Sequence, residues 1–127
     1  MPRPVIGLFA AMAVLTASTA ASGARTPERV YQNHWCARAS GVTEFTLPDR
    51  TRVDCLTREF AVEVDFAHKW AEAVGQALYY SIRTEKRPGI VLIMEGDRDE
   101  RFLERLRAVT SASDITLWTI TPAELGP

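Results

Sequence analysis

Several features are scarce in this chain of 127 residues, and each scarcity excludes a class of protein. The chain has two histidines and two cysteines, and His34 and His68 form no zinc-ligand spacing with the cysteines, which argues against a zinc protein. It has no excess of basic residues, since 15 Lys and Arg stand against 16 Asp and Glu, so its overall charge is not that of a typical nucleic-acid-binding domain. It has no repeats or low-complexity tracts, which excludes a repeat architecture.

A short apolar run lies at the N-terminus. It reads VIGLFAAMAVLTA over residues 5–17, with Arg3 before it and small residues after it that end in Ser22-Gly23-Ala24. A basic start, a short apolar run and a small-residue cleavage site are typical of a secretory signal peptide. The run is shorter than the about 20 residues that span a bilayer. We therefore expect residues 1–24 to be a signal peptide, with Ala20 or Ala21 as other cleavage points and an uncleaved N-terminal anchor as the alternative.

Residues 25–127 are then expected to form one small domain that is periplasmic or secreted. Loss of residues 1–24 removes Arg3 and no acid, so 14 basic residues face 16 acidic ones, a net charge of −2. No later segment is apolar enough to cross a membrane, so we expect no stable membrane insertion after signal removal. The sequence leaves the oligomeric state open, a homodimer included.

The two cysteines, Cys36 and Cys55, are expected to form a disulfide, because two cysteines in a small exported domain usually pair. The loop from 36 to 55 inclusive would hold 20 residues. Closing such a loop stabilises the fold by roughly 3 kcal/mol in the chain-entropy model. The alternative is a pair of free, buried thiols.

Hydrophobic periodicity predicts the element order α-β-β-β-α-β-α-β. The run Lys86-Arg87-Pro88-Gly89 reads as the stop of the central helix. The buried stripe expected on that helix contains Trp70, Ala73, Val74, Ala77, Leu78 and Ser81. We expect helices over residues 27–39, 68–84 and 97–111, and strands over residues 42–47, 51–57, 60–67, 90–94 and 115–121.

Acidic residues follow the second and third predicted strands. Asp54 lies in the second strand, and Glu63 and Asp65 alternate with apolar residues in the third, a period of two that sends both to one face. Carboxylates on adjacent strands are a common way to hold a hard divalent cation. The helix that follows carries Lys69, Glu72 and Gln76 along one side.

This pattern resembles the PD-(D/E)xK nuclease superfamily, which includes restriction endonucleases and archaeal Holliday junction resolvases. The resemblance covers residues 28–121. Asp54 matches the first acid better than Pro48-Asp49, which lies in a turn, and Glu63-Val64-Asp65 stands where the (D/E)-x-K tripeptide would be. Gln76 matches a helical glutamine of many members, and Glu28 an extra acid of resolvase-like members. The resemblance implies an α/β fold, with a three-layer αβββαβ core around a central mixed sheet.

The resemblance also implies a function and a role for each residue. The expected activity is Mg²⁺-dependent hydrolysis of DNA, with Asp54, Glu63 and Asp65 as metal ligands and Gln76 orienting a phosphate. Asp65 takes the place of the superfamily's lysine, so Lys69, at the start of the next helix, is the candidate for a migrated catalytic lysine. The alternatives are a catalytically inactive binding module on the same fold, and a structural protein in which these charges are ordinary surface.

Overall fold

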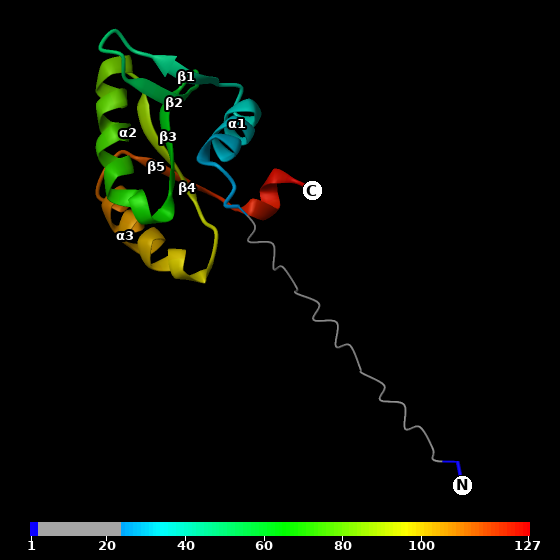
Figure 1. Ribbon diagram of the computed structural model, residues 1–127. Helices are drawn as coiled ribbons and strands as arrows, with labels where there is room; N and C mark the ends of the chain where they lie inside the picture. Colours follow the sequence, from blue (N-terminus) through cyan, green and yellow to red (C-terminus); the bar gives the residue numbers. More distant parts are fainter. Residues whose placement is uncertain (3–23) are drawn as a thin grey trace.

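The computed structural model of the protein describes residues 1–2 and 24–127 (Figure 1). The signal peptide predicted for residues 1–24 therefore lies almost wholly outside the described residues. Within the described part of the chain, no helix is long and apolar enough to span a membrane.

The order of the helices and strands agrees with the one predicted from the sequence. Three short 3₁₀ turns are added to it: η1 (Ala67–Lys69), η2 (Asp97–Asp99) and η3 (Pro122–Leu125). The helices are α1 (Glu28–Arg38), α2 (Trp70–Thr84) and α3 (Glu100–Ser111), and the strands are β1 (Val42–Thr46), β2 (Arg52–Leu56), β3 (Phe60–Phe66), β4 (Arg87–Ile93) and β5 (Thr116–Ile120).

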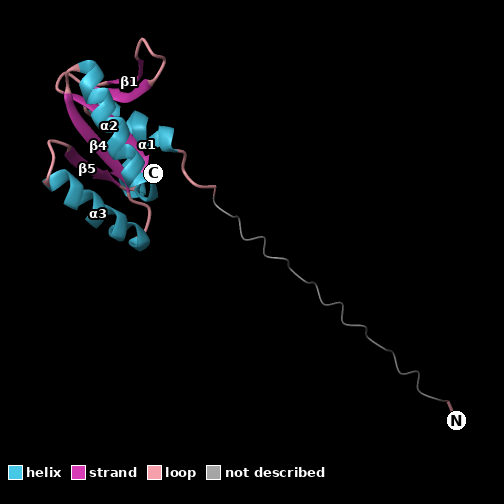
Figure 2. Cartoon of the chain, turned by 90° about the vertical axis from the view of Figure 1, so that its left-hand side faces the viewer, coloured by secondary structure: helices cyan, strands magenta, loops and turns pink. Residues whose placement is uncertain are grey.

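The five strands form one mixed sheet in the order β1-β2-β3-β4-β5. Strands β1, β2 and β3 pair antiparallel, and β3, β4 and β5 pair parallel. The two parallel connections run through α2 and α3, which lie on one face of the sheet, while α1 lies on the other (Figures 1 and 2). The protein is therefore an α/β domain whose sheet is covered by helices on both faces.

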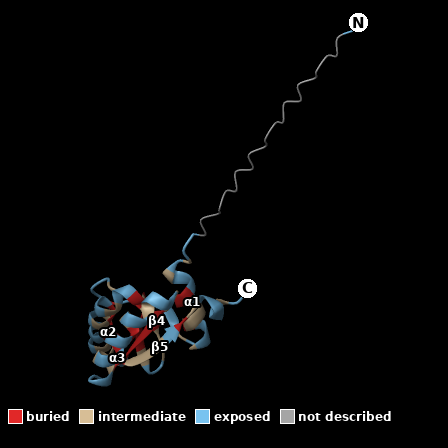
Figure 3. Ribbon diagram, turned by 90° about the horizontal axis from the view of Figure 1, so that it is seen from below, coloured by how far each residue is buried: buried red, intermediate tan, exposed pale blue. Residues whose placement is uncertain are grey.

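Strand β4 is the centre of the core, as its uninterrupted apolar sequence predicts. Val91 and Ile93 belong to the apolar cluster on the α1 side, and Ile90 and Leu92 to the cluster on the side of α2 and α3. Figure 3 shows the buried residues gathered along the sheet, between the helices of the two faces. The sheet is rigid here because both faces of its middle strands are packed.

The predicted start of β4 at residue 90 is wrong, because the strand begins at Arg87 and includes Pro88 and Gly89. Proline fits an extended backbone, and Pro88 stands opposite Ala61 in the parallel ladder with β3. Gly89 lies under the Trp118 ring, where a Cβ atom would come within 2.7 Å of the ring. Pro88 and Gly89, which the sequence suggests as a helix stop, thus also belong to the first residues of a strand.

The predicted buried stripe of α2 is wrong at Leu78, which is 40% exposed. The buried positions are Ala73, Ala77 and Tyr80, and a helix turns by about 100° from Ala77 to Leu78. The predicted starts of α2 and α3 also shift, because residues 67–69 and 97–99 form 3₁₀ turns before these helices.

The Cys36–Cys55 disulfide is present and joins α1 to β2, as predicted. Both sulfurs lie against Gly41, in the turn between α1 and β1. A Cβ atom on Gly41 would lie 2.8 Å from the Cys36 sulfur and closer still to that of Cys55. The disulfide and the glycine therefore belong together, since only a residue without a side chain leaves room for the bridge.

Candidate active site

The site is formed where β2 and β3 separate. The two strands pair only at Cys55–Val62 and Leu56–Ala61. Val53 and Cys55 would share one face of a regular strand, yet they lie in different core clusters, so β2 is distorted at Asp54. The Asp54 carboxylate replaces the missing ladder bond, because its Oδ2 accepts the Val64 N–H at 2.8 Å.

A second hydrogen bond holds this distortion from the other face of the sheet. The Gln32 side chain, buried on α1, donates from Nε2 to the Asp54 backbone carbonyl at 2.8 Å. Both the backbone and the side chain of Asp54 are thus held in place, although the strand is irregular there. The result is a fixed carboxylate at the junction of two strands.

A cavity of about 540 Å³ opens at this junction. Its walls come from α1, β1, the β1–β2 turn, β2, β3 and α2. The residues that line it are Glu28, Arg29, Gln32, Glu44, Arg50, Thr51, Arg52, Asp54, Glu63, Gln76 and Tyr80.

Glu63 is the least ordinary residue of this cavity. It is 5% exposed, and its Oε2 is buried without a hydrogen-bond partner among the described residues. Burial raises the pKa of its carboxyl group far above the usual range, and the neighbouring charges of Asp54 and Asp65 raise this pKa further. A buried acid without a partner is costly, so its presence indicates a ligand or a proton at this position.

The pKa values of Asp54 and Asp65 are also raised, in both cases first by burial. The charge of Glu28 adds to the shift of each, so four carboxyl groups influence one another here. Asp65 is 5% exposed, and its Oδ1 accepts the Phe66 N–H at 2.9 Å. Glu63 and Asp65 are therefore close enough for their charges to interact, but only Glu63 lines the cavity, together with Asp54.

Of the three residues predicted to line one side of the helix, the structure places one in the cavity wall and two outside it. Gln76 lines the cavity together with Asp54 and Glu63. Lys69, the last residue of η1, lies beside Asp65 with its Nζ 3.9 Å from Oδ1, and it is not part of the cavity lining. Glu72 is exposed on α2. The lysine thus contacts one of the three acids, at the side of the cavity.

Several cavity residues had no signal that identified them in the sequence. Glu44, in β1, has a φ of 53°, in the left-handed region that residues with side chains rarely adopt. Its carboxylate accepts a hydrogen bond from Nη2 of Arg29 at 3.2 Å, and its other oxygen lies 3.6 Å from Nε of Arg52. In the register of β1 and β2, Glu44 stands opposite Asp54, so the two irregular residues face each other across the ladder.

The cavity wall also contains two arginines and a tyrosine. Arg50 and Arg52 are exposed and lie at the rim of the cavity. Tyr80 is buried, and its pKa is raised to about 12, first by burial and then by the charge of Glu63. The cavity therefore has acids on its floor and arginines on its rim.

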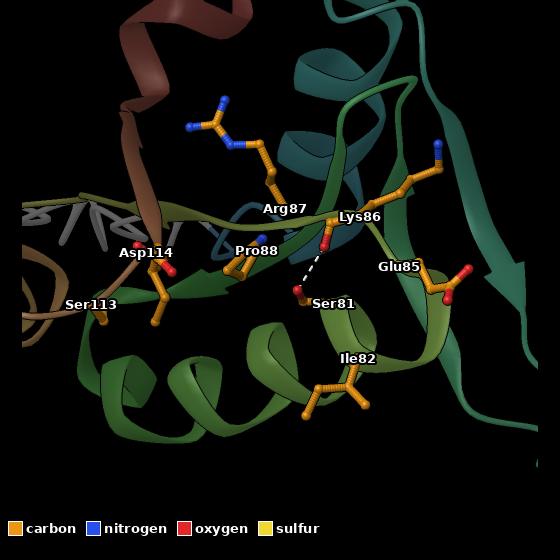
Figure 4. A pocket seen from close by; sticks show the side chains of 9 residues that line it. Ser81, Ile82, Glu85, Lys86, Arg87, Pro88, Ser113 and Asp114 are labelled. Carbon is orange, nitrogen blue, oxygen red and sulfur yellow. Dashed lines mark hydrogen bonds between the residues drawn. The ribbon is translucent and has the colours of Figure 1, made fainter.

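A larger hollow of about 690 Å³ lies at the starts of β4 and β5 (Figure 4). Its walls include Ser81, Lys86 and Asp114, and the Ser81 hydroxyl donates to the Lys86 carbonyl at 2.6 Å. Among the described residues, the only buried side-chain nitrogen or oxygen atom without a hydrogen-bond partner is Oε2 of Glu63, and Glu63 does not line this hollow. We therefore assign the candidate site to the acidic cavity.

The described residues contain no group of three or more His, Cys, Asp or Glu arranged to hold a metal ion as they stand. Comparison with known proteins finds no matching family model, no matching curated protein and no matching solved structure. What the geometry defines is an α/β domain with a rigid, acidic cavity between two diverging strands. Its function has to be argued from that cavity.

Proposed function

We propose that this protein is a Mg²⁺-dependent phosphodiesterase that cleaves DNA in the acidic cavity. The observation that carries the proposal is Glu63, a buried acid in the cavity wall whose Oε2 has no hydrogen-bond partner among the described residues. Hard divalent cations prefer carboxylate oxygens, and a cation would also offset the repulsion between Glu63 and its acidic neighbours. The disulfide favours an oxidising compartment, so we place this activity in the periplasm or outside the cell.

Asp54 and Glu63 line the cavity and would supply two carboxylate ligands for such an ion. Asp65, buried at the next position on the same side of β3, would approach the ion only when it binds, because the acids as they stand in the described chain do not form a metal-holding group. A bound cation supplies the charge that lowers the pKa of a water molecule and neutralises a phosphate oxygen. The element order and these positions support a restriction-endonuclease-like core, which we propose as the finer description of the fold.

The remaining residues have roles that follow from their positions. The arginines at the rim, of which Arg50 has no ion-pair partner among the described residues, would bind phosphate oxygens. Lys69, which lies beside Asp65, would add positive charge at the side of the site and act on the charge that develops in the reaction. Gln76 would orient a phosphate or a water molecule from α2.

A catalytically inactive binding module is the second candidate. It is favoured by the position of Lys69, because no lysine lines the cavity among the described residues. In that case the arginine rim and acidic floor would bind a ligand without cleaving it. Metal binding and DNA cleavage separate the two functions.

The first test replaces Glu63 by glutamine. Glu63→Gln keeps the shape of the side chain but removes a charged ligand, so we expect DNA cleavage with Mg²⁺ to be lost and Mn²⁺ affinity to fall at least tenfold by calorimetry. Glu104→Gln is the matched control, because Glu104 is exposed on α3 and has no described partner. Wild-type protein that binds neither metal and cuts neither single- nor double-stranded DNA would contradict the nuclease proposal. The catalytically inactive binding module would then remain as the function.

A second test concerns the lysine. Lys69→Ala should lower the cleavage rate strongly and leave metal affinity nearly unchanged, because its charge acts on the reaction and not on the ion. Asp65→Lys would restore the (D/E)-x-K tripeptide of the superfamily. It should raise the cleavage rate little if Lys69 already acts as the catalytic lysine. Equal loss of metal binding and cleavage in Lys69→Ala would contradict the proposed role of the lysine.

A further inference from the structure

Helix α2 has a second apolar stripe on its solvent side. It consists of Ala71, Gly75, Leu78 and Ile82, all of them exposed, and is called the outer stripe below. Leu78 is 40% exposed and Ile82 75%. Figure 4 shows the Ile82 side chain pointing away from the strands, while Ser81 on the same turn points toward them.

The spacing of the outer stripe is that of a helix–helix seam. Its members follow one another by four, three and four residues, as the a and d positions of a coiled coil do. A surface helix needs one apolar side to cover its own core, and α2 already provides it with Ala73, Ala77 and Tyr80. The outer stripe therefore has no partner within the described chain.

The sizes of the residues make the outer stripe complementary to itself. Its N-terminal half is small, Ala71 and Gly75, and its C-terminal half is large, Leu78 and Ile82. A Cβ atom on Gly75 would meet nothing within 4 Å, so the space beside it is open. In an antiparallel pair of α2 helices, one two-fold axis between positions 76 and 77 places Leu78 against Gly75 and Ile82 against Ala71.

The charges beside the outer stripe agree with the same arrangement. Glu72 and Arg83 lie on one flank of it, about 90 to 110° around the helix from its centre. Neither has an ion-pair partner among the described residues. The same two-fold axis brings Glu72 of each copy to within about two residues of Arg83 of the other along the helix axes.

We propose that the protein forms a symmetric homodimer in which α2 packs antiparallel against α2 of a second copy. This proposal does not depend on the catalytic one, because the outer stripe lies outside the acidic cavity. A stable interface buries roughly 800 Å² on each partner, and one helix of 15 residues provides less. The dimer is therefore a weak one, with a dissociation constant in the micromolar range.

The test is sedimentation velocity over a concentration series of the mature protein. Ile82→Glu should weaken the dimer about a hundredfold, by placing an acid against an apolar position of the partner. Val42→Glu is the matched control, because Val42 is also apolar and exposed, at 60%, but lies on the edge strand β1. A dimer broken by Val42→Glu and not by Ile82→Glu, or wild-type protein that is monomeric at several hundred micromolar, overturns the proposal.

A charge reversal tests the orientation. Glu72→Arg should weaken the dimer about tenfold, and the double variant Glu72→Arg, Arg83→Glu should restore it nearly to the wild-type value. Far-ultraviolet circular dichroism shows whether each variant is folded, and Glu72 and Arg83 are both exposed. A double variant that is no better than Glu72→Arg alone overturns the antiparallel pairing.

Discussion

Individual residues of the cavity are held in states that oppose folding. Glu63 is a buried acid with an oxygen that lacks a partner, and Glu44 has a left-handed backbone inside a strand. Among the described residues, the other three with positive φ and a side chain, Ser40, Arg50 and Glu85, lie in turns or at helix ends, where such a backbone is common. Unfavourable states persist when the surrounding structure imposes them, and they gather at functional sites.

Glu63→Gln should make the folded protein more stable at pH 8. The amide carries no charge, so the variant avoids both the burial of a carboxylate and its repulsion by Asp54 and Asp65. We expect the free energy of unfolding to rise by about 1 to 3 kcal/mol, measured by urea titration without metal. The control is again Glu104→Gln, which should change it by less than about 0.5 kcal/mol.

The left-handed backbone of Glu44 leads to a prediction about stability. Glu44→Gly and Glu44→Ala both remove the ion pairs with Arg29 and Arg52, but only glycine adopts a φ of 53° without strain. The left-handed backbone costs a residue with a side chain about 1 to 2 kcal/mol. The glycine variant should therefore be more stable than the alanine variant by about 1 kcal/mol in chemical denaturation. A more stable alanine variant would show that the strand relaxes at this position.

At the scale of elements, the sequence predicts the position of a site residue where the periodicity of its own strand or helix determines that position. The alternation in residues 60–66 places Glu63 and Asp65 on one face of β3, and Gln76 follows on the helix that packs against it. The sequence does not predict Glu44 or Arg29 in the site, because their place depends on the distortion of β1 and β2 and on how α1 crosses the sheet. Lys69 lies in the 3₁₀ turn beside Asp65 and outside the cavity lining, and helical periodicity does not predict such a turn.

A substitution in the turn between α1 and β1 tests whether the disulfide that joins α1 to β2 requires glycine at position 41. Gly41→Ala places a methyl group against both sulfurs of the disulfide, so we expect a loss of about 1 to 3 kcal/mol in the free energy of unfolding. Gly96→Ala is the matched control, since a Cβ atom there meets nothing within 4 Å. In a Cys36→Ala, Cys55→Ala background the penalty of Gly41→Ala should shrink, because the sulfurs are gone. An unchanged penalty would mean that the backbone, and not the bridge, requires glycine.

At the scale of the whole molecule, the acids should determine how stability depends on pH. The pKa values of Asp54 and Asp65 are raised to about 6 and about 7, so the folded protein retains protons that the unfolded chain releases near pH 4. The free energy of unfolding should therefore fall as the pH rises from about 4 through 7. Below pH 4 the sign reverses, because the pKa of Asp49 is lowered to about 2 by its hydrogen bonds with Thr51 and Tyr79.

Thermal unfolding across this range measures the effect, and the proposed metal binding predicts that divalent cations change it. At pH 8, Mg²⁺ at 100 times its dissociation constant should stabilise the wild type by about 3 kcal/mol and Glu63→Gln by much less. A wild-type protein that is most stable at pH 8 without metal would show that the acids are not held as close together as the structure has them.

The bond from the Val64 amide to Asp54 has a spectroscopic consequence. Its proton points at a carboxylate oxygen, with 2.8 Å between nitrogen and oxygen, where a regular ladder would offer a neutral carbonyl. The resonance of that proton is therefore sensitive to the charge on Asp54, and it moves when the acid gains a proton or shares its electrons with a cation. One amide signal in the middle of the sheet thus reports on the state of the site in solution, with no label added and no substrate required.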